Sequence, residues 1–261
     1  MQHAPAARPL LASALSATLA LTAAACTTGG RAADRPAGTT SATAQSPAAL
    51  PSPAVPPALT REQARAALIT EADLGEAWEP TRGAATWRDE VLKATAERPD
   101  CGRLLDVLYT EELFGTASDP RATVALDDAA GGAQLHFRIT SHRAADIDRT
   151  LAWLATLPDT CGRFTARTAR GATRDARVTG LALPEAGDAR QGLRVTVSAE
   201  GAESAEGAVL TVDLVAVRIG DDAISLTNGG LGAPADDATR TAVETGTERL
   251  AEVRRQGRAQ V

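Results

Sequence analysis

Few residues of this chain have the types and spacing that catalysis requires. His136 and His142 fall on the same side of an alternating polar and apolar run, where they could form a metal-binding or acid/base pair. The polar side of a strand often carries such residues, so an ordinary surface role also fits. Ser141 lacks the G-x-S-x-G turn that exposes a nucleophilic serine, and an N-cap explains it better. The sequence therefore predicts no catalytic residue.

The carboxylates that stand close together in the sequence flank turns or exposed helix positions. They are Asp127 with Asp128, Asp146 with Asp148, and Asp221 with Asp222. We interpret each as a solvated turn or helix cap, because nothing in their spacing pairs two of them across a substrate. The sequence predicts no metal site and no cofactor.

Arginines between residues 163 and 177 form a local basic concentration in an acidic protein. The guanidinium fork binds carboxylate or phosphate through two hydrogen bonds, so these side chains could hold an anionic ligand. They could equally be the polar side of edge strands, where charge discourages edge pairing. We assign Arg138, Arg163 and Arg167 as possible ligand-binding residues.

The first 26 residues indicate export. An apolar run from Leu10 to Leu21 follows Arg8, which is typical of a secretory signal peptide over residues 1–25. The segment that ends in Ala24-Ala25-Cys26 resembles a bacterial lipobox, in which the cysteine is acylated, for instance with palmitate. We therefore expect attachment through a lipid to the outer face of the cytoplasmic membrane. Ordinary cleavage after an Ala-x-Ala site, which would give a secreted protein, is the alternative.

Lipidation of Cys26 would leave Cys101 and Cys161 as an even pair. We expect a structural disulfide between them, because neither a C-x-x-C motif nor a histidine cluster favours a metal or redox pair. Residues 26–59 are rich in Ala, Pro, Thr and Ser and read as a flexible tether. Residues 60–261 are then one folded domain. The formal net charge of −6 gives no general attraction to nucleic acid.

Sequence periodicity predicts the elements of this domain. Thr60 is a plausible N-cap, and Cys101 to Leu108 carry an apolar helical face. Two alternating runs near Val124 and Leu135 predict a hairpin, followed by a helix that Pro158 ends. Further strand-like runs follow, of which residues 209–219 are apolar on both faces and should lie centrally. A helix over residues 236–255 closes an α+β fold with a mainly antiparallel sheet flanked by helices.

Several short motifs, in this order, resemble actinobacterial exported proteins of the PknH-like extracellular sensor domain family. They are Thr70-Glu71-Ala72-Asp73-Leu74 with Trp78, Cys101-Gly102-Arg103-Leu104-Leu105, Cys161-Gly162-Arg163-Phe164, Gly187-Asp188, and Arg218-Ile219-Gly220. The resemblance implies an antiparallel sheet flanked by helices, with a cleft for an unidentified ligand, carried on receptor kinases or on stand-alone lipoproteins. The chain resembles the stand-alone type, with one cysteine pair where the kinase-borne pattern has two.

These observations predict an exported, lipid-anchored sensor or binding protein without enzymatic activity. Its partner would be a small molecule, a cell-wall fragment or another envelope protein. A cell-wall hydrolase or esterase whose carboxylates meet only on folding is one alternative, and a structural component of an envelope protein complex is another.

Overall fold

The computed structural model describes residues 58–115, 118–199, 209–232, 234 and 236–259. The predicted signal peptide, Cys26 and the tether up to residue 57 lie outside these residues, so those assignments stay predictions. None of the helices among the described residues is long and apolar enough to cross a membrane.

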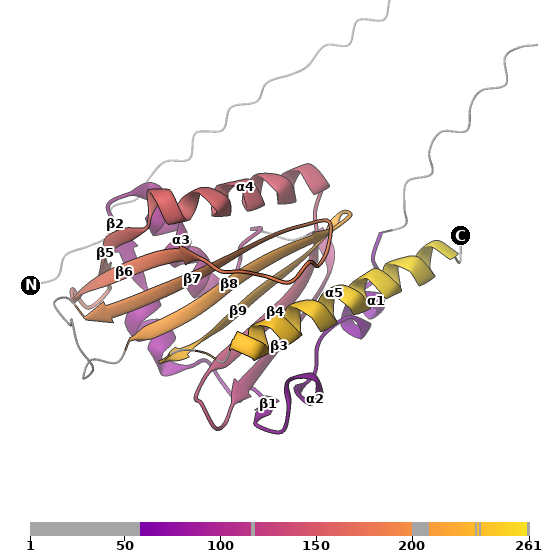
Figure 1. Ribbon diagram of the computed structural model, residues 1–261, viewed down its shortest axis with the longest axis horizontal. Helices are drawn as coiled ribbons and strands as arrows, with labels where there is room; N and C mark the ends of the chain where they lie inside the picture. The colour runs from indigo at the N-terminus through magenta and orange to yellow at the C-terminus, as the bar shows by residue number, and fades with distance from the viewer. Residues whose placement is uncertain (1–57, 116–117, 200–208, 233, 235, 260–261) are drawn as a thin grey trace, which may run out of the picture. The chain divides into compact units, whose positions relative to one another are not determined.

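The strands of the described residues form one antiparallel sheet in the order β1-β3-β4-β9-β8-β7-β6-β5-β2 (Figure 1). This confirms the predicted fold class. The strands are β1 (Trp78–Pro80), β2 (Ala94–Ala96), β3 (Ser118–Asp128), β4 (Gln134–Ser141), β5 (Arg163–Thr168), β6 (Thr173–Gly180), β7 (Ala189–Ala199), β8 (Leu210–Ile219) and β9 (Asp222–Leu231).

Strand β8 lies at the centre of this sheet, as its two apolar faces predict. Residues 210–217 are all buried, because helices cover the sheet on both sides there. The predicted hairpin is β3 with β4, in which Leu135, Phe137 and Ile139 face one core and the residues between them face the other side.

Helices pack on both faces and divide the core in two. The helical segments are α1 (Arg61–Ala66), α2 (Glu71–Leu74), the π-helix η1 (Arg88–Leu92), α3 (Pro99–Thr110), α4 (Ala144–Thr160) and α5 (Asp236–Ala259). One core joins α3 and α4 to β6, β7 and β8, and the other joins α1 and α5 to β3, β4 and β9. In Figure 1, α4 runs beside β6 and β7, whereas α5 crosses the opposite half of the sheet.

The predicted disulfide is present. Cys101 in the first turn of α3 and Cys161 at the C-cap of α4 have Cα atoms 5.6 Å apart and are completely buried. Closing a loop with a sequence separation of 60 stabilises the fold by roughly 4 kcal/mol on the chain-entropy model. The bond fastens the two helices of one core to each other.

Helix ends follow the sequence signals in one case and depart from them in two. Thr60 is the N-cap of α1, as predicted, and it forms a capping box with Gln63. Pro158 does not end its helix, because α4 continues to Thr160. The last turn is held by the buried Leu157, whose carbonyl accepts a hydrogen bond from the N–H of the disulfide-bonded Cys161 at 2.7 Å.

The role assigned to Ser141 was also wrong. Ser141 ends β4 and its hydroxyl donates to Asp222 Oδ1 at 2.6 Å, whereas α4 begins after Arg143. The cap of α4 comes from the β8–β9 turn, where Asp221 Oδ1 accepts from the N–H of Ala144 at 3.0 Å. Asp222 is 1% exposed and pairs with Arg254 of α5, so it is not a solvated turn residue.

Candidate functional site

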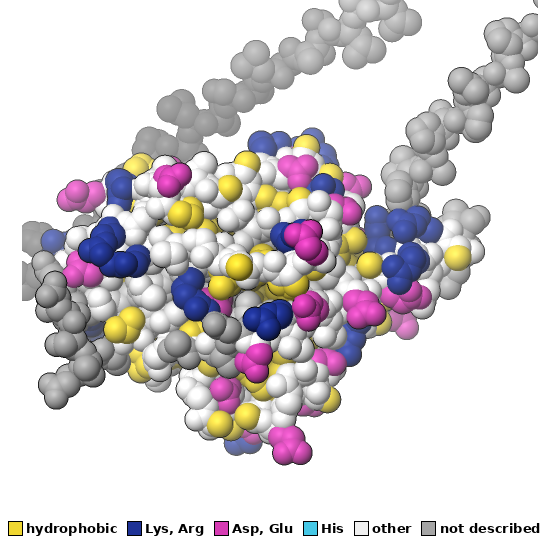
Figure 2. Space-filling model, viewed as in Figure 1, with side chains coloured by type: hydrophobic (Ala, Val, Ile, Leu, Met, Phe, Trp, Pro, Cys, Tyr) yellow, Lys and Arg dark blue, Asp and Glu magenta, His cyan; other side chains and the backbone are white. Residues whose placement is uncertain are grey.

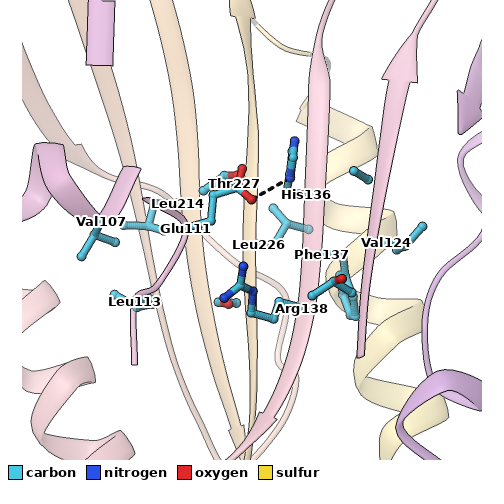
Figure 3. Close-up of a pocket in the computed structure, with 13 residues that line it drawn as sticks. Val107, Glu111, Leu113, Val124, His136, Phe137, Arg138, Leu214, Leu226 and Thr227 are labelled. Atoms are coloured by element: carbon cyan, nitrogen blue, oxygen red, sulfur yellow. Dashed lines mark ion pairs between the residues drawn. The ribbon is translucent and has the colours of Figure 1, made fainter. Parts of the chain in front are cut away.

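A cavity of about 130 Å³ lies beneath the C-terminal end of α3, on the side of the sheet that α3 and α4 cover. Side chains from α3, from the segment after it and from four neighbouring strands line this α3 cavity (Figure 3). The lining includes the apolar Val107, Leu113 and Leu214, the hydroxyls of Thr123, Ser225 and Thr227, and Glu111, His136 and Arg138.

Glu111 is positioned by the way α3 ends. It is the C-cap residue, with φ 60° and ψ 18°, and it is the one residue other than glycine with positive φ in the part of the chain that the structure describes. A left-handed conformation costs such a residue about 1 kcal/mol or more and is often retained at functional sites. The turn directs the Glu111 carboxylate between Arg88 and His136, with Oε1 2.6 Å from Arg88 Nη1 and Oε2 2.7 Å from His136 Nδ1.

Arg88 forms the buried end of this arrangement. Its side chain is 6% exposed, and its guanidinium donates to Gln134 Oε1 at 3.1 Å and to the carbonyl of Leu108 at 3.4 Å. Burial lowers the pKa of Arg88, and the charge of Glu111 opposes that shift. Arginine stays protonated in proteins, so the pair is a true buried ion pair.

Gln134 links Arg88 to a carboxylate at the end of β3. Its amide nitrogen donates to Asp127 Oδ1 at 2.8 Å, and the Thr81 hydroxyl donates to the same oxygen at 2.6 Å. Burial acts to raise the pKa of Asp127, but these hydrogen bonds outweigh it and the pKa is lowered. The network therefore fixes the wall of the α3 cavity from the outer strands to α3.

His136 faces Glu111 through one ring nitrogen only. Its Nε2 atom is buried and has no hydrogen-bond partner among the described residues. In Figure 3 this second nitrogen points away from Arg138. No hydroxyl of the described residues is therefore bound to the histidine as a nucleophile would be, and the Glu111–His136 pair does not extend into a triad.

Arg138 lies one pleat further along β4 than His136 and on the same face. The register places it opposite Thr123 of β3 and Ser225 of β9. The residue is half-buried, and its guanidinium has no ion pair or hydrogen bond to any described residue. The α3 cavity thus combines an unpaired cation with neighbouring hydroxyls.

The two histidines do not meet. His142 belongs to a separate hollow with Phe114, Arg103 and Asp146, where the Phe114 and His142 ring centroids are 5.5 Å apart. Six residues of extended chain place it roughly 20 Å from His136. Burial lowers the pKa of His142, which Asp146 partly opposes. Within the described residues no group of three or more His, Cys, Asp or Glu could hold a metal ion.

Arg163 and Arg167 lie far from Arg138. They are exposed residues of β5, which is five strand positions from β4, so about 24 Å separates the strands. Their side chains project from the opposite face, where Arg163 stands directly across from Arg177 of β6. Figure 2, drawn from the direction of Figure 1, shows basic and acidic side chains interspersed over one side of the molecule. The structure places only Arg138, of the three predicted ligand-binding residues, in the α3 cavity.

Sequence reasoning missed most of this site. Arg88, Glu111 and Gln134 come from three segments that are far apart in the sequence, and none belongs to a motif. Only the alternation in β4, which places His136 and Arg138 on one face, could have indicated part of it.

Comparisons with known proteins find similarity among solved structures. No protein-family model matches the chain, and no curated protein matches it. Among solved structures, the chain is similar to the extracellular domain of PknH from Mycobacterium tuberculosis, with 13% sequence identity and a TM-score of 0.47. The similarity covers 76% of this chain and 98% of that chain.

Proposed function

We propose that this chain is an exported, lipid-anchored binding protein that recognises a small molecule in the α3 cavity and does not catalyse a reaction. The observation that supports the proposal most is the α3 cavity itself. Its wall is held by the buried Arg88–Glu111 ion pair and the hydrogen bonds of Gln134, so the site is formed before a ligand arrives. Preformed cavities lined by apolar groups and a few polar ones are typical of small-molecule sites.

The arrangement of His136 supports a binding role over a hydrolytic one. General acid/base catalysis needs a titratable nitrogen within hydrogen-bond reach of the substrate. His136 Nδ1 is occupied by Glu111, and Nε2 is buried on the side away from Arg138. A ligand beside Arg138 would therefore meet a cation and hydroxyls, not a free base.

Export and anchoring rest on the sequence together with the disulfide. Disulfides persist in oxidising compartments, which agrees with a signal peptide before Cys26. We expect radiolabelled palmitate to be incorporated into the full chain and lost in a Cys26→Ser variant. If the wild-type chain carries no label and is recovered from the medium, the protein is secreted and the proposed lipid anchor is wrong.

Binding is tested by a thermal-shift screen of the processed protein with cell-wall fragments, lipids and small metabolites. We expect one or more compounds to raise Tm, since a ligand that binds only the folded state stabilises it. Ser225→Leu places a larger side chain in the α3 cavity and fills part of it, so this substitution should abolish that shift. Thr179→Leu, an exposed change on β6, should preserve it.

Silence across the whole screen, together with a stable envelope protein complex, would contradict the proposal. A Tm shift of the same size in a correctly folded Ser225→Leu variant would also contradict the proposal, because the ligand would then bind outside the α3 cavity.

A further inference from the structure

The positive charge of Arg138 has no negative counterpart among the residues that the structure describes. Six of the other buried or half-buried arginines each face a carboxylate. These pairs are Arg88 with Glu111, Arg190 with Glu185, Arg194 with Asp213, Arg218 with Asp148, Arg249 with Asp73, and Arg254 with Asp222. Arg138 is half-buried in a cavity wall and pairs with no described residue. A partly desolvated charge without a partner is costly, so a ligand that supplies an anion would be favoured.

Glu111 cannot serve as that partner in the present arrangement. Among the described residues, it is the one carboxylate that lines the α3 cavity. Its two oxygens already face Arg88 and His136 at 2.6 Å and 2.7 Å. Moving the Glu111 carboxylate toward Arg138 would leave the buried Arg88 without its ion-pair partner. An unpaired charge at the buried Arg88 costs more free energy than one at the half-buried Arg138.

Hydroxyl groups surround Arg138 on the same face of the sheet. Thr123 and Ser225 are its direct cross-strand neighbours, and Thr227 lies one pleat further along β9. Thr227 Oγ1 accepts from Arg88 Nη2 at 3.4 Å, so its own hydrogen remains able to donate. A carboxylate at Arg138 would therefore find a guanidinium and up to three hydroxyl donors.

The rest of the lining limits the size and character of the ligand. Val107, Leu113 and Leu214 provide apolar walls. Cavities of about 150 Å³ hold a benzene molecule. The α3 cavity, at about 130 Å³, therefore takes on the order of six non-hydrogen atoms.

We propose that the α3 cavity binds the carboxylate end of a small acid with a short apolar body, anchored by Arg138 and by the hydroxyls of Ser225 and Thr123. This inference rests on the proposed function. A phosphate monoester fits less well, because its charge at neutral pH approaches two and a single unpaired arginine would leave the excess charge partly buried.

The test compares three probes that share one apolar body, a 2-methylpropyl group: 3-methylbutanoate, its neutral amide 3-methylbutanamide, and 2-methylpropyl phosphate. Affinities are measured by calorimetry on the processed wild-type protein at neutral pH. We expect the acid to bind roughly ten- to a hundredfold more tightly than the amide, because hydrogen bonds to a charged group are the stronger ones. The phosphate should bind more weakly than the acid.

Variants assign the preference to Arg138. In Arg138→Gln the acid and the amide should bind equally weakly, whereas Arg138→Lys keeps the charge and should keep part of the preference. Arg163→Gln, an exposed arginine on the opposite face, should bind the probes as wild type does. The comparison of acid with amide on the wild-type protein needs no variant, so it decides the question even if a variant fails to fold.

Each other outcome has its own meaning. Equal binding of acid and amide, or tighter binding of the phosphate, would overturn the carboxylate inference and leave a binding protein of another ligand class. No binding of any of the three, while other compounds in the thermal-shift screen bind, overturns the carboxylate inference alone. No binding of any compound in either experiment overturns both proposals.

Discussion

Two buried polar clusters lie on opposite faces of the same sheet, and only one of them borders a cavity. The α5 cluster consists of Arg194, Asp213, Asn228 and Thr239. Arg194 donates two hydrogen bonds to Asp213, at 2.7 Å and 3.0 Å, and the Thr239 hydroxyl donates to the same carboxylate at 3.0 Å. Asn228 completes the cluster by donating to Thr239 at 3.0 Å.

The α3 cluster, made of Arg88, Glu111, Gln134 and His136, is built from the same kinds of group but borders a cavity. A helix closes the α5 cluster, because α5 supplies Thr239. Each cluster holds one buried atom without a described hydrogen-bond partner, Nε2 of His136 and Oδ1 of Asn228, but only the α3 cluster adjoins the unpaired Arg138. A buried ion pair that a helix covers indicates a structural role. A buried ion pair that holds a cavity wall next to an unpaired charge indicates a binding site.

The largest effect on stability that we expect from this comparison is in the α5 cluster. Asp213 is completely buried, so Asp213→Ala should lower the free energy of unfolding by about 3 kcal/mol, because Arg194 and Thr239 lose their acceptor. Urea denaturation with the disulfide intact measures the change.

Arg138→Gln is the matched variant beside the α3 cavity. It should change the free energy of unfolding by less than about 0.5 kcal/mol, because Arg138 has no described partner to lose. Equal losses in the two variants would show that Arg138 has a structural role and would remove the distinction between the clusters.

A smaller effect should separate the tight packing under α5 from the looser packing near α3. Gly246 of α5 lies against the buried ring of Phe137, and a Cβ atom there would overlap that ring. Gly246→Ala should therefore destabilise the protein by about 2 kcal/mol, despite the helix propensity of alanine.

Gly102 in α3 is the control for this substitution. A Cβ at Gly102 would lie 3.6 Å from the carbonyl oxygen of Ala96, an ordinary contact. Gly102→Ala should stabilise the protein by up to about 1 kcal/mol, since alanine suits a helix interior. Thermal unfolding measures the stability of both variants. Stability changes of the same sign in Gly246→Ala and Gly102→Ala would contradict this account of the packing.

The smallest effect concerns pH, and the two faces should respond in opposite directions. Asp127, beside the α3 cluster, has a lowered pKa, so its contribution to stability is present above the unfolded value of about 3.9 and is lost as the pH falls through the folded pKa. Burial raises the pKa of Asp222, against the opposing effects of Ser141 and Arg254. Its contribution is present below about pH 3.9 and is lost as the pH rises through the folded pKa.

Asparagine substitutions separate the two contributions. Asp127→Asn should flatten the loss of Tm on the acid side, and Asp222→Asn should flatten the loss as the pH rises above about 4. Tm is measured across the acidic range with the disulfide intact. Identical pH profiles for the two variants would argue against opposite shifts on the two faces.

The sequence predicted the strongly periodic elements and missed those that depend on neighbours. The β3–β4 hairpin, the central position of β8 and the cap at Thr60 follow from alternation, two-faced apolarity and the capping box. The three-residue strands β1 and β2 were not predicted, because so short a segment carries no period and forms only where an edge of the sheet accepts it.

Residue type and local spacing were sufficient for the disulfide of Cys101 and Cys161, for the α+β class and for the polar face of β4 that carries Arg138. Each of these depends on a period or on the chemistry of one residue type. The site depended on folding, because Arg88, Glu111 and Gln134 meet only when η1, the end of α3 and β4 pack together. Contacts between residues far apart in the sequence leave no local pattern, so the unpaired state of Arg138 became visible only in three dimensions.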